Sequence, residues 1–254
     1  MKYFILCLVV LFLNTSCIAA SFTKDVNLNV KSENFKGKKS EIKITFVGHA
    51  TLIIENNGKV YHIDPWSNVG DYSKLPKADV IFITHEHYDH WDQEAVNQIA
   101  KTDTKIFCSK AVYEELENKK LATVLKNGDN IEYKEIRIET VPAYNIKHKA
   151  NNNEPFHPKG RGNGYILTID GIRIYIAGDT ENVPEIKNLQ NIKVAFLPFN
   201  LPYTMDKTMF EDLANSIKAE FTYPYHTSGT TQQIINDLNV TNTNLRIRQF
   251  HRNK

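Results

Sequence analysis

Cysteine is scarce in this 254-residue chain, which excludes a fold stabilised by disulfides. Of the 3 cysteines, Cys7 and Cys17 lie near the N-terminus and only Cys108 lies in the body of the sequence. If the N-terminal segment is removed by processing, no internal bridge can form. A structural zinc site built from several thiolates is excluded for the same reason. The stability of the fold must therefore come from its core.

Net charge and long apolar runs are lacking as well. The chain has 31 Lys+Arg against 29 Asp+Glu, a formal charge of +2, so no strong net field directs it to nucleic acid or to an acidic membrane. Beyond the N-terminus, no stretch approaches the roughly 20 apolar residues that a membrane span needs. Hydrophobic residues make up 41% of the chain, which at this length is enough for one globular core.

The first twenty residues differ in composition from the rest of the chain. Lys2 precedes an apolar run from Tyr3 to Leu13, and small and polar residues follow up to Ala20. This order is typical of a secretory signal, and the run is too short for a transmembrane anchor. We therefore expect residues 1–20 to be a signal peptide and residues 21–40, rich in Lys, Asn and Ser, to form a polar tether. The protein would then be periplasmic or secreted.

Two ways of processing this signal remain open. Cleavage after Ala19 or Ala20 gives a free protein, whereas cleavage before Cys17 and lipidation of that cysteine give a membrane-anchored lipoprotein. Asn14 stands where lipoprotein signals usually carry an aliphatic residue, which weakens the second alternative. The oligomeric state is not indicated by the sequence.

Residues 41–254 have the pattern of one domain made of short strands and a few amphipathic helices. Apolar and β-branched runs such as Ile42–Val47, Thr51–Glu55 and Val80–Thr84 predict strands. A helix is predicted over Asp92–Lys101, and another begins at a predicted Asp206 cap. Hairpins mixed with helices that follow strands indicate a two-sheet sandwich with helices outside.

One short segment carries the most specific chemical pattern. His85, His87, Asp89 and His90 fall within six residues at the end of a predicted apolar strand. His85 and His87 would share one face if the strand continued, whereas Asp89 and His90 lie past the turn and can reach a second position nearby. Imidazole nitrogens and a carboxylate suit zinc or a similar divalent ion. The pattern predicts two divalent metal ions, with zinc favoured.

This segment, His85-x-His87-x-Asp89-His90, resembles the signature of the metallo-β-lactamase superfamily. Three further residues follow in the superfamily's order: Asp64 closes an early strand, Asp179 follows Gly178, and His226 follows a late strand. The resemblance covers Ile42 to His226 and implies an α/β (αββα) fold, a four-layer sandwich of two mixed β-sheets flanked by helices. It also implies that Asp179 bridges the two metals, that His226 is a ligand and that Asp64 orients ligand side chains.

A narrower resemblance concerns the branch within the superfamily. Gly48-His49-Ala50-Thr51, Ile63-Asp64-Pro65 and Val141-Pro142-Ala143-Tyr144 are similar to the branch of ascorbate-6-phosphate lactonase-like proteins and the N-acyl-phosphatidylethanolamine-hydrolysing phospholipase D. In many relatives a histidine follows the last of these segments and completes the first metal site. Asn145 stands at this position here.

The replacement for that histidine is His148 or His157, and we favour His157. It lies between two prolines, Pro155-Phe156-His157-Pro158, which can hold a loop rigid. Its distance from His90 also suits the superfamily's third-histidine position. Asn145 could itself be a weak oxygen ligand, and loss of the first metal is a further alternative.

The resemblance and the ligand pattern together imply an exported zinc-dependent hydrolase. A metal-activated hydroxide would attack a small ester, lactone, amide or phosphodiester, with Asp89 as the catalytic residue that orients or deprotonates the water. The partner is a small molecule rather than nucleic acid, because no nuclease-type insertion is visible. The alternative is a catalytically silent superfamily member that binds a ligand or a metal, motivated by Asn145.

Other polar residues receive weaker predictions. His49 and Tyr225 are expected near the pocket or behind the ligands, whereas His62 is expected to be solvated. Pocket residues could also come from Asn200 and Tyr203. The segment 145–163, with four cations, either covers the pocket and receives an anionic group or is a solvated loop. These cations are Lys147, Lys149, Lys159 and Arg161.

Overall fold

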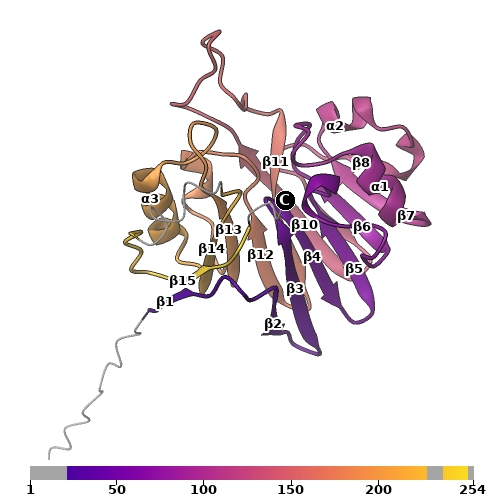
Figure 1. The fold of residues 1–254 in the computed structure, drawn as a ribbon, viewed down its shortest axis with the longest axis horizontal. Helices are drawn as coiled ribbons and strands as arrows, with labels where there is room; N and C mark the ends of the chain where they lie inside the picture. The colour runs from indigo at the N-terminus through magenta and orange to yellow at the C-terminus, as the bar shows by residue number, and fades with distance from the viewer. Residues whose placement is uncertain (1–21, 228–236, 251–254) are drawn as a thin grey trace, which may run out of the picture.

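The computed structural model describes residues 22–227 and 237–250, in which two mixed β-sheets face each other (Figure 1). One sheet has the order β1 (Lys24–Val26), β15 (Asn244–Ile247), β14 (Phe221–Tyr225), β13 (Val194–Pro198), β12 (Ile172–Ile176), β11 (Gly162–Ile169), β10 (Ile136–Ala143) and β9 (Asn130–Tyr133). The other has the order β2 (Ser32–Lys36), β3 (Glu41–Gly48), β4 (Thr51–Asn56), β5 (Lys59–Ile63), β6 (Ala78–Ile83), β7 (Ala100–Cys108) and β8 (Ala122–Val124).

Helices cover the outer faces of the two sheets. In Figure 1, α1 (Gln93–Ile99) and α2 (Lys110–Glu115) lie beside β6 to β8, and α3 (Lys207–Ile217) lies beside β13 and β14. Three short 3-10 helices complete the described elements: Ser67–Val69, Lys119–Leu121 and Pro184–Ile186. The α/β (αββα) four-layer sandwich expected from the sequence is confirmed.

Three apolar clusters correspond to these layers. Ile44, Phe82 and Phe196 belong to the cluster between the sheets, where alternate residues of each strand point inward. Separate clusters join α3 to one sheet and α1 to the other. The predicted Asp206 cap is confirmed, because its side chain accepts a hydrogen bond from Met209 N.

The polar tether expected over residues 21–40 is wrong for the described part, residues 22–40. β1 pairs with β15 and β2 pairs with β3, so the segment adds an edge strand to each sheet. Edge strands are held by backbone hydrogen bonds and can keep a polar outer face, which hid them in the sequence. Phe35 supplies the apolar anchor, since it is buried and its ring lies 5.6 Å from that of Phe221. Residues 1–21, with the expected signal peptide, lie outside the described residues.

The carboxyl ends of several parallel strands meet at one edge of the sandwich. β5 runs parallel to β6 in one sheet, and β12, β13 and β14 run parallel in the other. Asp64 follows β5, His85 lies two residues beyond β6, Asp179 follows β12 and His226 follows β14. The topology therefore places residues from distant parts of the sequence at the same edge. In the described part of the chain, no helix has the length and apolarity to cross a membrane.

Candidate metal centre

The structure brings the seven side chains expected as metal ligands together, and His49 joins them. The side chains form three overlapping groups, and within each group the potential ligand atoms lie within 4.8 Å of one another. They are His85 with His87 and His157, His85 with His90 and Asp179, and His49 with Asp89, His90 and His226. These residues come from five loops of both sheets, so the centre exists only in the assembled sandwich.

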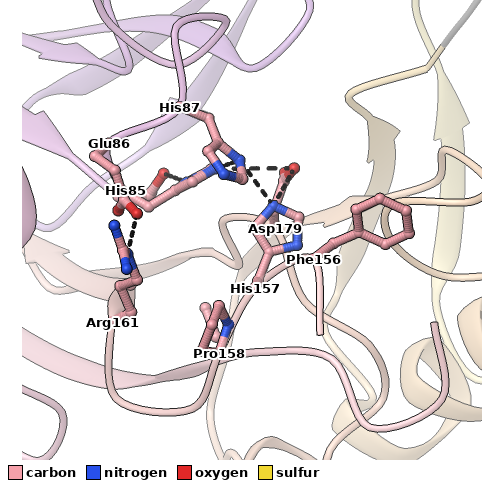
Figure 2. A pocket seen from close by; sticks show the side chains of 11 residues that line it. His85, Glu86, His87, Phe156, His157, Pro158, Arg161 and Asp179 are labelled. Atoms are coloured by element: carbon pink, nitrogen blue, oxygen red, sulfur yellow. Dashed lines mark hydrogen bonds and ion pairs between the residues drawn. The ribbon is translucent and has the colours of Figure 1, made fainter. Parts of the chain in front are cut away.

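Asp179 lies between the two sides of this centre (Figure 2). Its Oδ2 is 3.3 Å from His157 Nε2 and 3.2 Å from His226 Nε2, and its Oδ1 is 3.2 Å from His90 Nε2. Gly178 precedes it with a φ of +66°, a conformation that favours glycine. The hydroxyl of Tyr225 accepts a hydrogen bond from Gly178 N at 2.8 Å, so Tyr225 is buried behind the turn that presents Asp179.

One side of the centre is formed by His85, His87 and His157. His87 Nδ1 lies 3.2 Å from His85 Nε2 and 3.2 Å from His157 Nε2. His157 belongs to the loop between β10 and β11, and Figure 2 shows it facing His87 and Asp179. His148 belongs to no such group among the described residues. The geometry therefore places His157, and not His148, beside the pair His85 and His87.

Asn145 contacts His157 instead of pointing into the centre. Its Oδ1 accepts hydrogen bonds from the backbone N of His157 at 2.8 Å and from the ring Nδ1 at 2.7 Å. A proton on Nδ1 leaves Nε2 unprotonated and turned to the other histidines, as metal ligation requires. The Asn145 amide nitrogen in turn donates to Glu181 Oε1 and to the carbonyl of Tyr203.

The other side of the centre contains Asp89, His90, His226 and His49. Asp89 Oδ2 lies 3.0 Å from His49 Nε2 and 3.6 Å from His226 Nε2. His49 sits in the tight turn between β3 and β4 with a φ of +50°, which aims its ring at the centre. The Asn200 amide lies 3.3 Å from His226 Nδ1, the ring nitrogen on the far side from Asp89.

Asp64 and Thr84 lie behind the ligands and hold two of them. Asp64 Oδ2 is 2.8 Å from His90 Nδ1, and both groups are fully buried. Thr84 donates its backbone N and its hydroxyl to the same carboxylate, and its hydroxyl lies 3.0 Å from His85 Nδ1. A carboxylate behind a histidine fixes the ring orientation and makes the histidine a stronger ligand.

The sequence reasoning missed Thr84 and Glu181. Thr84 directly precedes the histidine motif, so its position was a usable signal. Glu181 is buried and accepts the backbone N–H groups of residues 146–148, at 2.8, 2.8 and 2.6 Å. No spacing rule points to this role, because it depends on the path of the loop after β10.

The electrostatic environment shifts the pKa values of several side chains in the centre. Burial disfavours ionised Asp179, yet nearby His226 and His90 hold its pKa well below the usual range. Burial lowers the pKa of His85 far below its ordinary value, and burial together with the charge of His226 lowers that of His49 to about 4. Burial opposes protonation of His90, but Asp179 and Asp64 outweigh it and raise its pKa. Asp179 is therefore ionised and the imidazoles of His49 and His85 are neutral at pH 7.

Buried polar atoms that make no hydrogen bond provide the test of whether these residues fit a metal. His90 Nε2, Asp179 Oδ1 and His226 Nε2 are buried and make no hydrogen bond. Such atoms carry a free-energy penalty unless a ligand satisfies them. All three face the centre and belong to donor types that bind divalent ions, so the residues present fit a metal.

One expectation outside the centre needs correction. His62 was expected to be solvated, but it is fully buried and its Nε2 lies 2.9 Å from the carbonyl of Pro76. The strand is covered on both faces, so the alternation of apolar and polar residues along it does not mean that His62 is exposed. Three cations of the loop after β10 form ion pairs with carboxylates, and their side chains stay more than half exposed. The pairs are Lys147 with Asp206, Lys159 with Glu185, and Arg161 with Glu86.

Comparison with known proteins gives a consistent set of relatives. The family model described as the Beta-lactamase superfamily domain matches residues 43–226. A UPF0173 metal-dependent hydrolase of Ligilactobacillus salivarius is 31% identical over 207 residues, covering 77% of this chain and 90% of that protein. One from Ignicoccus hospitalis is 29% identical over 196 residues, covering 73% and 82%.

Solved structures agree with these matches. One is a crystal structure of a protein from Parabacteroides distasonis that is named after the metal-dependent hydrolases. It has a TM-score of 0.80 and 40% identity, and the match covers 87% of this chain and 99% of that one. Igni18, a metallo hydrolase from Ignicoccus hospitalis, has a TM-score of 0.64 and 24% identity over 84% of this chain and 96% of that one. At that identity, the second comparison concerns the fold alone.

Proposed function

Because this chain belongs to the metallo-β-lactamase superfamily, and within it to the UPF0173 metal-dependent hydrolases, we propose that it hydrolyses a small molecule with two divalent metal ions, zinc being favoured. Its relatives support a metal-dependent hydrolase. The substrate class proposed is a small ester, lactone, amide or phosphodiester.

The position of Asp179 carries this proposal. One of its carboxylate oxygens lies within 3.3 Å of a nitrogen from each side of the centre, namely His157 Nε2 and His226 Nε2. A carboxylate shared in this way suits two neighbouring cations. His85, His87 and His157 would hold the first ion, and Asp89, His90 and His226 the second.

When bound, divalent metals lower the pKa of a bound water and supply hydroxide as a nucleophile. The protein residues then have separate tasks. Asp89 is partly accessible at the centre, where it can orient a water and accept its proton. His49, 3.0 Å from the same carboxylate, keeps Asp89 in place. Asp64 and Asn145 orient His90 and His157 from behind.

The pocket supports a small substrate. It is a small depression, partly open to solvent, beside His85, His87 and Asp179. Nucleic acid is disfavoured as a partner because the net charge of the chain is small. The similarity of residues 48–51 and 141–144 to the ascorbate-6-phosphate lactonase-like and phospholipase D-like branch stays part of this proposal.

Export is also part of the proposal. Residues 1–20 have the composition of a secretory signal, and Cys17 offers a site for a lipid anchor. Mass spectrometry of the protein from its native host distinguishes cleavage after Ala20 from lipidation at Cys17. An intact N-terminus would contradict both.

The function is tested with the zinc-loaded protein on activated esters, lactones and bis(p-nitrophenyl) phosphate. We expect Asp89→Ala to lower turnover at least 100-fold, because it removes a ligand and the group that orients water. His62→Gln changes a buried histidine outside the centre and serves as the control. Unchanged turnover in Asp89→Ala would remove Asp89 from the mechanism. Absence of both metal and turnover in the wild type would favour the catalytically silent alternative.

A further inference from the structure

Exposed apolar side chains lie in the loops around the metal centre. In the described part of the chain, seven large hydrophobic side chains are exposed, and four of them lie in loops that carry or contact proposed ligands. We call these four the apolar rim. They are Tyr88 at 72%, Ile146 at 56%, Leu201 at 52% and Tyr203 at 45% relative exposure.

Tyr88 forms one part of the rim. It stands between His87 and Asp89 in the ligand motif, so its backbone position is set by the centre itself. Its ring centroid lies 5.9 Å from that of Trp66, and Trp66 lies 5.2 Å from His49. An exposed tyrosine in this place is not needed to complete the core.

Ile146 and Tyr203 form a second part through the loop after β10. Ile146 follows Asn145, and its backbone N is fixed by Glu181 at 2.8 Å. The carbonyl of Tyr203 accepts from the Asn145 amide at 2.9 Å. The Tyr203 ring lies 5.0 Å from the ring of Phe156, which lines the pocket next to His157 (Figure 2). Leu201 lies in the same loop as Tyr203 and follows Asn200, whose amide reaches His226.

The charges nearest the pocket are already paired. Arg161 lines the pocket but forms an ion pair with Glu86, on the side opposite Phe156 in Figure 2. Lys159 pairs with Glu185 and lies over the Tyr144 ring. These two cations already have carboxylate partners, whereas the exposed apolar side chains of the rim are an apolar surface that is already in place for an uncharged group.

We propose that the substrate carries an uncharged apolar chain or ring next to the bond that is cleaved, and that this group binds the apolar rim. The inference rests on the proposed function, and it names the class of substrate for the same centre. The compact pocket would take the polar, reacting end of the substrate, while Phe156 and the rim residues bury the apolar end.

Alkyl hydroxamates provide a test that does not depend on turnover, because their head group binds metal. Calorimetry on the zinc-loaded protein compares acetohydroxamate, octanohydroxamate and the ω-carboxylate analogue of the latter. We expect octanohydroxamate to bind at least about tenfold more tightly than acetohydroxamate, since each buried CH₂ contributes up to about 0.8 kcal/mol. The ω-carboxylate should lose most of that gain.

Single substitutions show which side chains cause the tighter binding of octanohydroxamate. Tyr203→Ser and Ile146→Ser should each reduce the octanohydroxamate advantage several-fold and leave acetohydroxamate affinity and zinc content unchanged. Val124→Ser removes an exposed apolar side chain on β8, away from the rim, and should change nothing.

Two results would overturn the inference alone. In one, the two hydroxamates bind equally to a protein that holds zinc and hydrolyses a test substrate. In the other, the alkyl chain length of the hydroxamate has no effect on binding, but the protein sediments with neutral phosphatidylcholine vesicles and Tyr203→Ser releases it. The apolar rim would then be a membrane contact. A protein that holds no zinc and binds neither hydroxamate would instead overturn the proposed function, and this inference with it.

Discussion

At the scale of single residues, the centre depends on side chains that touch ligands as much as on the ligands. Asn145 stands where the superfamily resemblance leads us to expect a histidine, and its carbonyl oxygen accepts from both the backbone N and the ring of His157. An asparagine at that position therefore need not abolish the first site. We propose that His157, twelve positions later, takes the ligand role.

Replacement of Asn145 tests this arrangement. Asn145→Leu leaves two buried donors of His157 without an acceptor, at a cost of about 1–3 kcal/mol each, and should lower zinc affinity about 10-fold to 100-fold. Asn145→Asp keeps the acceptor for His157 but sets a carboxylate oxygen against Glu181 Oε1 in place of the amide donor, so we expect an intermediate loss of affinity. Competition with a chromophoric chelator measures both. Equal affinity in Asn145→Leu and the wild type would show that His157 needs no such partner.

A second test compares three residues that could complete the first site. His157→Ala should lower zinc occupancy most, Asn145→Ala less, and His148→Ala least, because His157 alone of the three belongs to a ligand group in the described residues. Elemental analysis of the purified variants gives the order. Full occupancy in His157→Ala with loss in Asn145→Ala would reverse the assignment.

At the residue scale, the sequence is most informative where chemically specific side chains are close together. The run His85 to His90 predicts ligands by type and spacing, and the structure brings these side chains together. Thr84 and Glu181 were not found, because a threonine and a glutamate are common and their roles depend on which backbone groups come near. His62 was misjudged for a related reason, since strand alternation does not show that both faces are covered.

At the scale of elements, the loop between β10 and β11 supplies His157 to the centre, and another loop holds it in place. Glu181, from the loop after β12, accepts three successive backbone N–H groups of residues 146–148 and also the Asn145 amide. Because these N–H groups of the loop all donate to one buried carboxylate, they fix the conformation of the loop. The loop is therefore fixed by the same segment that presents Asp179.

Removal of this anchor should loosen the loop without unfolding the sheets. Glu181→Ala is expected to raise hydrogen exchange at residues 145–150 and to lower zinc affinity, because His157 loses its fixed position. Hydrogen exchange in β3 and β11 serves as the internal reference. Unchanged exchange in the loop would show that its conformation does not depend on Glu181.

Strands with alternating or continuous apolar residues, such as β3 and β6, were predicted close to their observed bounds. β1 and β2 were not, because edge strands are stabilised by backbone pairing and show little hydrophobic pattern. Glu33 gives a further reason, since this polar residue on β2 is held by ion pairs to Arg246 and Arg248 from the distant C-terminal segment. Such a contact cannot be inferred before the fold is known.

At the scale of the whole molecule, the centre joins the two sheets. The loop after β6 supplies His85 to His90, whereas Asp179 and His226 come from strands of the other sheet. Between the sheets, a metal would give coordinate bonds to the buried ring nitrogens and the carboxylate oxygen that make no hydrogen bond. Metal binding should consequently stabilise the entire fold.

Thermal unfolding measures this stabilisation. Zinc at a free concentration about 1,000 times the dissociation constant should add about 4 kcal/mol, which for a chain of this size raises the Tm by roughly 8–16 °C. The control variant His226→Ala should show a much smaller rise. An unchanged Tm in the wild type would mean that zinc does not bind the folded state preferentially.

The number of metal ions held by the folded protein tests the central claim most directly. Native mass spectrometry of the zinc-loaded protein, with elemental analysis of the same sample, counts the ions per chain. The two-sided arrangement around Asp179 predicts close to two equivalents in the wild type and about one in His157→Ala. A wild-type protein that saturates with one ion, or retains none, would contradict the assignment of Asp179 as the shared ligand.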